Sequence, residues 1–295
     1  MNALRSILLG ISLALTTTAC NDAPWDGGPA PSPLLYEISD RNGHVSGWMF
    51  GTIHSLPSTT HWRTHTLEQV VAEADILVVE IAALEDQAAL RDTFSQLATT
   101  PDQPDIGLKV PQESRPILFD LIGKSGLSPS DFSATETWAA ALILAQANND
   151  GNGSVNGADR ALLRDFAHRE VREFEGAERQ LGIFDALPEG EQRDMLMAVL
   201  SEAERHEKDP AKLRRAWLAG DLNALEDATT RGLLADPELR VALLTARNAD
   251  WMQQLLPMLQ SNDRPLVAVG TAHLVGPDGL AAMLEAHGYK VRRIQ

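Results

Sequence analysis

Cysteine occurs only once in the 295 residues, and aromatic residues make up only 5% of the chain. A single cysteine excludes a disulfide framework and every zinc or iron–sulfur site that needs several thiolates. Basic residues are also few: 25 Lys and Arg stand against 41 Asp and Glu, for a net charge of −16. Since nucleic acids require clustered Lys and Arg, we expect no nucleic-acid partner. Apolar residues still make up 44% of the chain, which suffices for a sizeable core.

Several familiar patterns are missing. The sequence contains no Walker A, G-x-G-x-x-G, G-x-S-x-G or H-E-x-x-H motif and no repeat of 20–50 residues. After the first 20 residues no apolar run is long enough for a transmembrane helix. These absences exclude the common nucleotide-binding, serine-hydrolase and zinc-protease signatures.

The first 19 residues are typical of an export signal. Arg5 precedes a short apolar run, Ile7–Leu15, and small residues stand before the only cysteine, Cys20. This segment resembles a bacterial lipoprotein signal, so we expect residues 1–19 to be a signal peptide and Cys20 to carry a lipid. The alternative is plain cleavage with an unmodified cysteine.

The predicted location follows from this signal. The expected protein is exported and bound to the cell envelope, with membrane contact only through its lipid anchor. Asn21 replaces the Asp that retains lipoproteins at the inner membrane. In a diderm bacterium the expected position is therefore the periplasmic side of the outer membrane. Without the lipid, the protein would be periplasmic or secreted.

The remaining chain predicts one α/β (α+β) domain. Residues 20–33 are rich in Pro and Gly and predict a flexible tether, which leaves residues 34–295 as a single domain. Apolar or alternating runs typical of strands lie near both ends, at 34–39, 45–53, 76–79, 266–269 and 291–294. Helical periodicity dominates the middle, above all residues 190–260. The pattern predicts a mixed sheet of N- and C-terminal strands with a large helical middle section.

Two matching segments end in histidine. Gly51-Thr52-Ile53-His54 and Gly270-Thr271-Ala272-His273 each follow a strand-like run, and Glu80 follows the buried run 76–79. Strand ends are where α/β sheets build sites. Two histidines and one carboxylate suit a divalent metal with open positions, which could activate water. The alternative is that each histidine is structural.

These segments are similar to the TraB/GumN family, which is related to the Tiki metalloproteases and more distantly to erythromycin-esterase-like and ChaN-like proteins. The resemblance rests on residues 35–38, 47–54, 74–80 and 267–280. It implies a fold of that kind and a metal-dependent, hydrolase-like site made by His54, Glu80 and His273. The family's Leu-Glu-Thr piece is Phe174-Glu175-Gly176 here, so its hydroxyl is lost.

The leading functional hypothesis is a peptidase-like hydrolase, in which metal-activated water attacks an amide or ester of a peptide or small molecule. His54 and His273 would be metal ligands, and Glu80 a third ligand or the general base. The ion would be divalent: Mn, Co or Zn. The alternative is a non-catalytic envelope lipoprotein whose pocket binds a metal, haem or peptide. No pattern indicates an oligomeric state.

Four further residues are secondary site candidates. Arg247 lies on an apolar helical stripe, next to Asn248, and should face a substrate anion or form an internal ion pair, for which Glu175 is the candidate. The segment from Asn148 to Asp159 follows a calcium-binding loop in outline, but its last ligand would be Asp rather than the bidentate Glu. We therefore favour a turn that ends with Asp159 as a helix N-cap.

Overall fold

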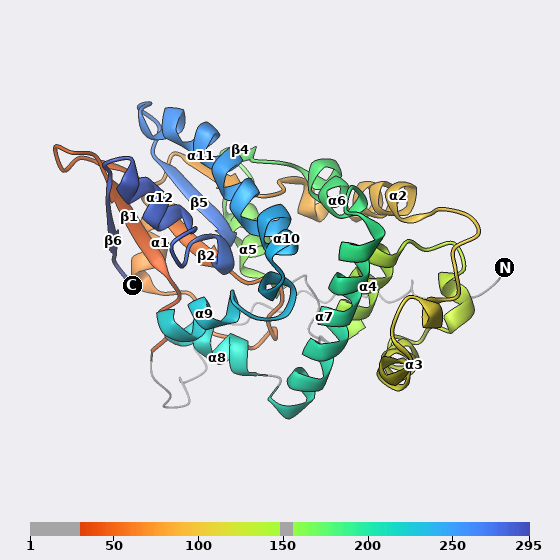
Figure 1. Ribbon diagram of the computed structural model, residues 1–295. Helices are drawn as coiled ribbons and strands as arrows, with labels where there is room; N and C mark the ends of the chain where they lie inside the picture. The colour runs from red at the N-terminus through yellow and green to blue at the C-terminus, as the bar shows by residue number, and fades with distance from the viewer. Residues whose placement is uncertain (1–29, 148–155, 210) are drawn as a thin grey trace, which may run out of the picture. The chain divides into compact units, whose positions relative to one another are not determined.

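A six-stranded mixed sheet joins the two ends of the chain (Figure 1). Its order is β4-β3-β5-β2-β1-β6. The strands are β1 (Leu35–Ser39), β2 (Val45–Thr52), β3 (Ile76–Val79), β4 (Glu170–Glu173), β5 (Pro265–Gly270) and β6 (Lys290–Arg293). Strands β2 to β5 run parallel, and β1 is antiparallel to β2 and β6. The predicted α/β class, with strands from both ends in one sheet, is confirmed.

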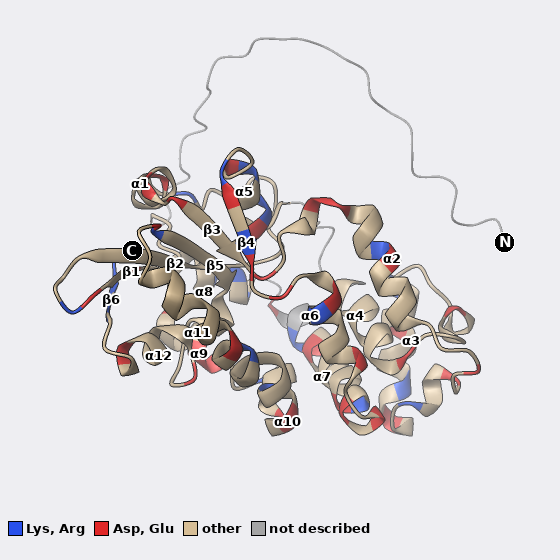
Figure 2. Cartoon of the chain, turned by 90° about the horizontal axis from the view of Figure 1, so that it is seen from above, with Lys and Arg blue, Asp and Glu red and all other residues tan. Residues whose placement is uncertain are grey.

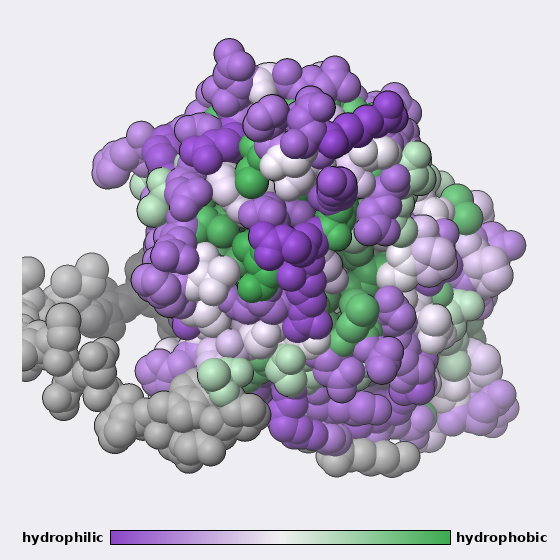
Figure 3. Space-filling model, turned by 90° about the vertical axis from the view of Figure 1, so that its left-hand side faces the viewer, coloured by the Kyte–Doolittle hydropathy of each residue, from purple (hydrophilic) through white to green (hydrophobic). Residues whose placement is uncertain are grey.

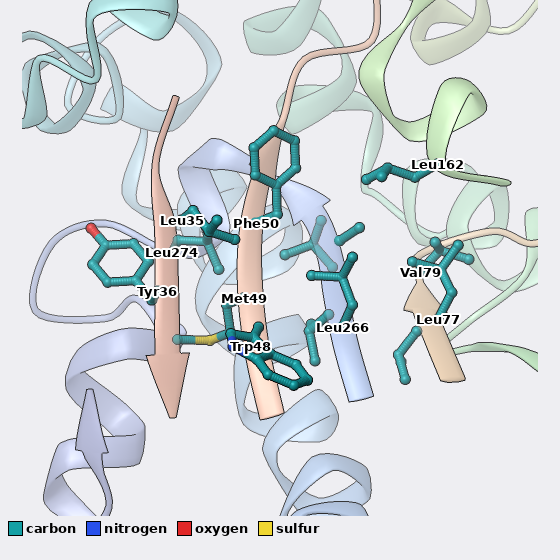
Figure 4. Packing of buried hydrophobic residues seen from close by; sticks show 14 of the residues in the cluster. Leu35, Tyr36, Trp48, Met49, Phe50, Leu77, Val79, Leu162, Leu266 and Leu274 are labelled. Carbon is teal, nitrogen blue, oxygen red and sulfur yellow. The ribbon is translucent and has the colours of Figure 1, made fainter. Parts of the chain in front are cut away.

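Helices cover both faces of this sheet (Figures 1 and 2). On one face lie α1 (His65–Glu73) and α5 (Ala158–Asp165), and on the other α11 (Ala246–Leu259) and α12 (Leu280–Ala286). Buried side chains of β2, β3 and β5 fill the space beneath them (Figure 4). Coverage on both faces explains why β3 and β5 read as continuous apolar runs.

The middle of the chain supplies a second, helical part with its own apolar cluster, which includes Trp138, Leu196 and Leu243. Its helices are α2 (Gln87–Ala98), α3 (Arg115–Lys124), α4 (Thr137–Ala147), α6 (Ala177–Asp185), α7 (Glu189–Lys208) and α10 (Pro237–Arg240). Two short helices, α8 (Lys212–Ala219) and α9 (Leu222–Ala228), follow α7, and Trp217 of α8 packs against Phe50 of β2. Hydrophilic residues cover most of the face seen in Figure 3.

The computed structural model describes residues 30–147, 156–209 and 211–295. Within it, Pro31–Gln295 form one compact unit. The expected signal peptide with Cys20 and residues 148–155 of the calcium-like loop lie outside the described residues. Ser32, expected in the tether, donates its backbone N–H to Leu218 at 2.7 Å. No helix in the described part is long and apolar enough to cross a membrane.

Two helix starts are informative. Helix α2 begins at Gln87, because the Asp86 carboxylate accepts the N–H of Ala89 and so caps it. Asp159 is not an N-cap, which corrects that prediction: Gly157 holds the cap position, and Asp159 lies in the first turn of α5. Its side chain is thereby free to serve another partner.

Candidate functional site

Three parallel neighbours, β3, β5 and β2, deliver the predicted residues to one edge of the sheet. Thr52 pairs with Gly270, and Val79 pairs with Ala268, so these strands end at the same level. Because parallel strands share their carboxyl-end edge, the residues that follow them meet there.

Gly270 lies at the centre of this meeting point. A methyl group built on its Cα would lie 3.3 Å from Glu80 Oε1, 3.8 Å from His273 Cδ2 and 3.9 Å from His54 Nε2. The Gly270 N–H itself donates to Glu80 Oε1 at 2.8 Å. Glycine here thus lets the backbone approach all three side chains.

His54 is held by a carboxylate from a distant part of the chain. Its Nδ1 lies 3.0 Å from Asp159 Oδ2, and its side chain is 64% exposed. This bond fixes the ring so that Nε2 faces the site. Loss of some surrounding water to the neighbouring chain would lower the pKa of His54, but the hydrogen bond and charge of Asp159, together with the charge of Glu80, raise it to about 9.

The loop before α5 brings Asp159 to His54. Ala158 donates its N–H to the carbonyl of Ile53 at 2.9 Å, which ties this loop to the end of β2. A Cβ on Gly157 would lie 2.4 Å from Asp159 Oδ1 and 2.5 Å from the carbonyl oxygen of His54. Only glycine fits between these groups, so Gly157 sets the distance between Asp159 and His54.

Replacing Gly157 with alanine should therefore destabilise the fold by about 1–3 kcal/mol, the usual range for overpacking. Gly182 is a matched control, because it lies within α6 and a Cβ there meets nothing within 4 Å. Alanine at Gly182 should stabilise by about 0.5–1 kcal/mol. Urea unfolding of both variants measures the difference, and equal effects would refute the close packing at Gly157.

His273 is buried and held in one tautomer. The Asn248 side-chain amide donates to the carbonyl of Asp278 at 2.7 Å, so its Oδ1 accepts from Nδ1–H of His273 at 2.6 Å. The lone pair of His273 therefore lies on Nε2. Burial, with the nearby positive charge of Arg247, lowers the pKa of His273 to about 4. The ring is thus neutral at pH 7 and packs on Trp251, with ring centroids 4.3 Å apart.

Arg247 joins two buried carboxylates. Its NH2 donates to Glu80 Oε2 at 2.7 Å and to Glu175 Oε2 at 2.8 Å, and its Nε donates to Glu175 Oε1 at 3.0 Å. The internal ion pair with Glu175, one of the two alternatives from the sequence, is present, and Glu80 is a second partner. Burial would raise the pKa of Glu80, but the charges of His273, Arg247 and His54 lower it to about 2.

A π-helical turn aims this arginine at the site. The turn spans Val241–Thr245, directly before α11, and Arg247 NH1 donates to Leu243 O at 3.2 Å. An extra residue in one helical turn rotates the residues that follow, and such bulges are frequent at functional sites. In this protein the π-helical turn comes just before the adjacent residues Arg247 and Asn248. Arg247 donates to Glu80, and Asn248 binds His273.

A cavity of about 220 Å³ opens beside these residues. Its lining comprises Thr52, His54, Val79, Glu80, Ile81, Leu84, Asp159, Arg160, Gln180 and Ala268. Three buried oxygens of this lining, Thr52 Oγ1, Asp159 Oδ1 and Gln180 Oε1, have no hydrogen-bond partner in the described part of the chain. Buried polar atoms are normally paired, so these three indicate that the cavity takes a polar ligand.

The expected metal can be tested against these side chains. Their donor chemistry fits a divalent cation: both imidazoles engage Nδ1 in a hydrogen bond and leave Nε2 for a metal, beside an ionised carboxylate. Among residues 30–147, 156–209 and 211–295, however, no three histidine, cysteine or carboxylate side chains are grouped closely enough to hold a metal as they stand. In addition, Arg247 NH1 lies 3.3 Å from His273 Nε2 and so engages one of the expected ligand atoms.

The structure thus brings seven predicted residues into one region: His54, Glu80, Asp159, Glu175, Arg247, Asn248 and His273. Sequence reasoning did not identify the cavity-lining Thr52 and Arg160 as site residues. A signal for Arg160 existed, since it directly follows Asp159 in α5. Gln180 lies on α6, a helix that the sequence pattern did not predict.

The fold and the polar cluster define an α/β protein with a site at the carboxyl ends of its parallel strands. The chain belongs to the TraB/PrgY/gumN family, whose family model matches residues 34–293. The resemblance noted in the sequence is thereby confirmed.

Two relatives show the same affiliation. The chain is 28% identical to the uncharacterized protein YbaP of Shigella flexneri over 253 residues, which cover 83% of this chain and 88% of that protein. It is 30% identical to YbaP of Escherichia coli K12 over 218 residues, or 72% of this chain and 77% of that protein. No solved structure matches the chain.

Proposed function

We propose that this TraB-family protein is a metal-dependent hydrolase, in which His54, Glu80 and His273 hold a divalent cation beside the substrate cavity. The supporting observation is the pair of oriented imidazoles. Asp159 and Asn248 each take up Nδ1 and leave Nε2 near Glu80. Histidines that bind metals have this arrangement, because the outer partner fixes the ring and raises its basicity.

The bound metal would supply an activated water for attack on an amide or ester. The chain's own residues orient and charge the site. The Gly270 N–H and Arg247 hold the Glu80 carboxylate. A general base needs a pKa near the working pH, whereas that of Glu80 is lowered to about 2. Of the two roles expected for Glu80, the pKa therefore favours the ionised ligand.

Metal binding at His273 Nε2 requires Arg247 to give up its contact with that nitrogen, since one lone pair serves one partner. Arg247 keeps three hydrogen bonds to Glu175 without it. The ion pair with Glu175 therefore lets the guanidinium remain buried while the site is loaded.

The test is metal stoichiometry by mass spectrometry, followed by cleavage of a peptide library. Wild-type protein should bind a stoichiometric divalent metal and cleave peptides only with it. His54→Ala and His273→Ala should each lose most of the metal, because two remaining ligands seldom hold a hydrolytic ion. The matched control is His44→Ala, which removes an exposed histidine from a similar pair with Asp40 at 3.3 Å.

Equal metal content in wild type and in the double variant His54→Ala/His273→Ala would contradict the proposed metal site. Metal that binds as expected, without turnover of any peptide or ester, would contradict the hydrolase and leave a metal-binding envelope protein.

A further inference from the structure

Arg160 is a buried cation without a close anionic partner. Its side chain is 8% exposed, and its NH1 donates to the carbonyl of Leu84. The nearest carboxylate oxygen, Glu85 Oε1, lies 3.9 Å away on a side chain that is 59% exposed and lies closer to Arg164, at 3.3 Å. In the part of the chain that the structure describes, no other acceptor contacts this guanidinium.

The contrast with Arg247 shows what is missing. Both arginine side chains are 8% exposed, but Arg247 makes four hydrogen bonds to two buried carboxylates. A guanidinium carries five N–H donors in a planar fork that matches a carboxylate. A buried charge without such a partner is strongly unfavourable. The Arg160 guanidinium thus lacks a close anionic partner, and an anion from outside the chain could take that place.

The position of Arg160 indicates where that anion belongs. Arg160 lines the same cavity as His54 and Glu80. The rest of the lining is apolar at Val79, Ile81, Leu84 and Ala268 and polar at Thr52, Asp159 and Gln180. Asp159 is already engaged with His54 through its Oδ2. With about 220 Å³, the cavity is smaller than the roughly 300–1,000 Å³ of pockets for drug-sized ligands, so it takes one end of a substrate.

We propose that Arg160 binds the terminal carboxylate of the substrate, and that the substrates are peptides or N-acyl amino acids with a free, apolar C-terminal residue. The apolar walls receive the side chain of that residue. Thr52 Oγ1 and Gln180 Oε1 are the acceptors for its amide N–H, since both lack a partner in the described chain. The amide to be cleaved then lies between Arg160 and the residues His54 and Glu80.

The cleavage half of this inference rests on the proposed hydrolase, and the binding half does not. Hydrolysis would break the C–N bond of the terminal amide and form a C–O bond from water to the carbonyl carbon. The amine nitrogen of the released amino acid takes up a proton, and the other product is a carboxylic acid. No oxidant or further reactant is needed.

Calorimetric titration of the purified protein with N-acetyl-L-leucine and with N-acetyl-L-leucinamide tests the binding half. The two probes differ only in the carboxylate. The acid should bind at least about tenfold more tightly than the amide, the effect expected for hydrogen bonds to a charged group. Arg160→Gln should abolish this preference. Arg164→Gln, one turn further along α5 and 51% exposed, is the matched control and should preserve it.

Equal affinity for acid and amide in wild type, or an unchanged preference in Arg160→Gln, would overturn the proposal. Arg160→Lys keeps the charge and should retain part of the preference even if the Gln variant folds poorly. Peptides with free and amidated C-termini then test cleavage. Carboxylate-dependent binding without cleavage would refute the hydrolase alone, and equal cleavage of both peptide forms would refute the role of Arg160.

Discussion

Replacement of Arg247 by methionine should lower the free energy of unfolding by about 3–5 kcal/mol, because it leaves two carboxylates buried without their cation. The side chains of Glu80 and Glu175 are only 11% and 2% exposed. Methionine fills most of the same volume, so the lower free energy of unfolding would result from the missing positive charge and not from a cavity. Urea unfolding at pH 7 gives the measurement.

The exposed pair Arg179–Asp250 is the matched control, because its atoms lie at the same 2.7 Å but its side chains are about half exposed. Arg179→Met should cost less than about 1 kcal/mol. Adding Glu175→Gln to Arg247→Met should recover part of the stability, since one uncompensated charge disappears. A loss in Arg247→Met no larger than that in Arg179→Met would show that water solvates the two carboxylates.

The convergence of the strand-end residues could be predicted from the sequence, because it depends on local signals and one general rule. The apolar runs 76–79 and 266–269 mark strands buried on both faces, and such strands are usually parallel. Parallel strands end at one edge, so Glu80 and His273 had to lie near each other. The apolar stripe around Arg247 likewise predicted a buried charge in need of an anion, either an internal carboxylate or one from a substrate.

The partner of His54 could not be predicted in this way. Asp159 lies 105 residues further along the chain, in a segment whose local pattern favours a turn and a helix cap. Its role depends on Gly157, which packs against the carbonyl of His54 and leaves no room for a side chain. The spacing of apolar residues along the sequence does not predict a contact between residues so far apart in the chain. The same holds for Arg160, because only the fold shows which side of α5 faces the cavity.

The metal-free protein should be most stable near pH 6.5 and lose stability on both sides, for opposite electrostatic reasons. On the acid side, burial with Arg247 lowers the pKa of His273 to about 4. Between pH 6.5 and 4 the unfolded chain therefore binds a proton at His273 that the folded chain excludes, and stability falls. The pKa of Glu80, lowered to about 2, extends the loss from pH 4.5 to 2. Each shift is about 2.5 pKa units, so each group contributes at most about 3–4 kcal/mol at 1.36 kcal/mol per pKa unit.

On the alkaline side His54 determines the change in stability, and its pKa shift has the opposite sign to those of His273 and Glu80. Asp159 and Glu80 raise the pKa of His54 to about 9, against the loss of some surrounding water and the charge of Arg247. A raised pKa means that the protonated imidazole stabilises the fold, so this contribution is complete below pH 6.5 and disappears as the pH rises through 9. The loss should be smaller than on the acid side, because the His54 side chain is 64% exposed and water screens the interaction.

Urea unfolding in EDTA at pH 4, 6.5 and 9 separates the groups that cause these two losses. His273→Gln should flatten the curve between pH 4 and 6.5, because glutamine does not titrate. Asp159→Asn should flatten it between pH 6.5 and 9, because the pKa of His54 then returns toward its ordinary value. Asp40→Asn, which breaks the exposed pair with His44, should leave the alkaline side unchanged. An alkaline loss that persists in Asp159→Asn would place the titrating group elsewhere and remove the evidence for a carboxylate-held imidazole at His54.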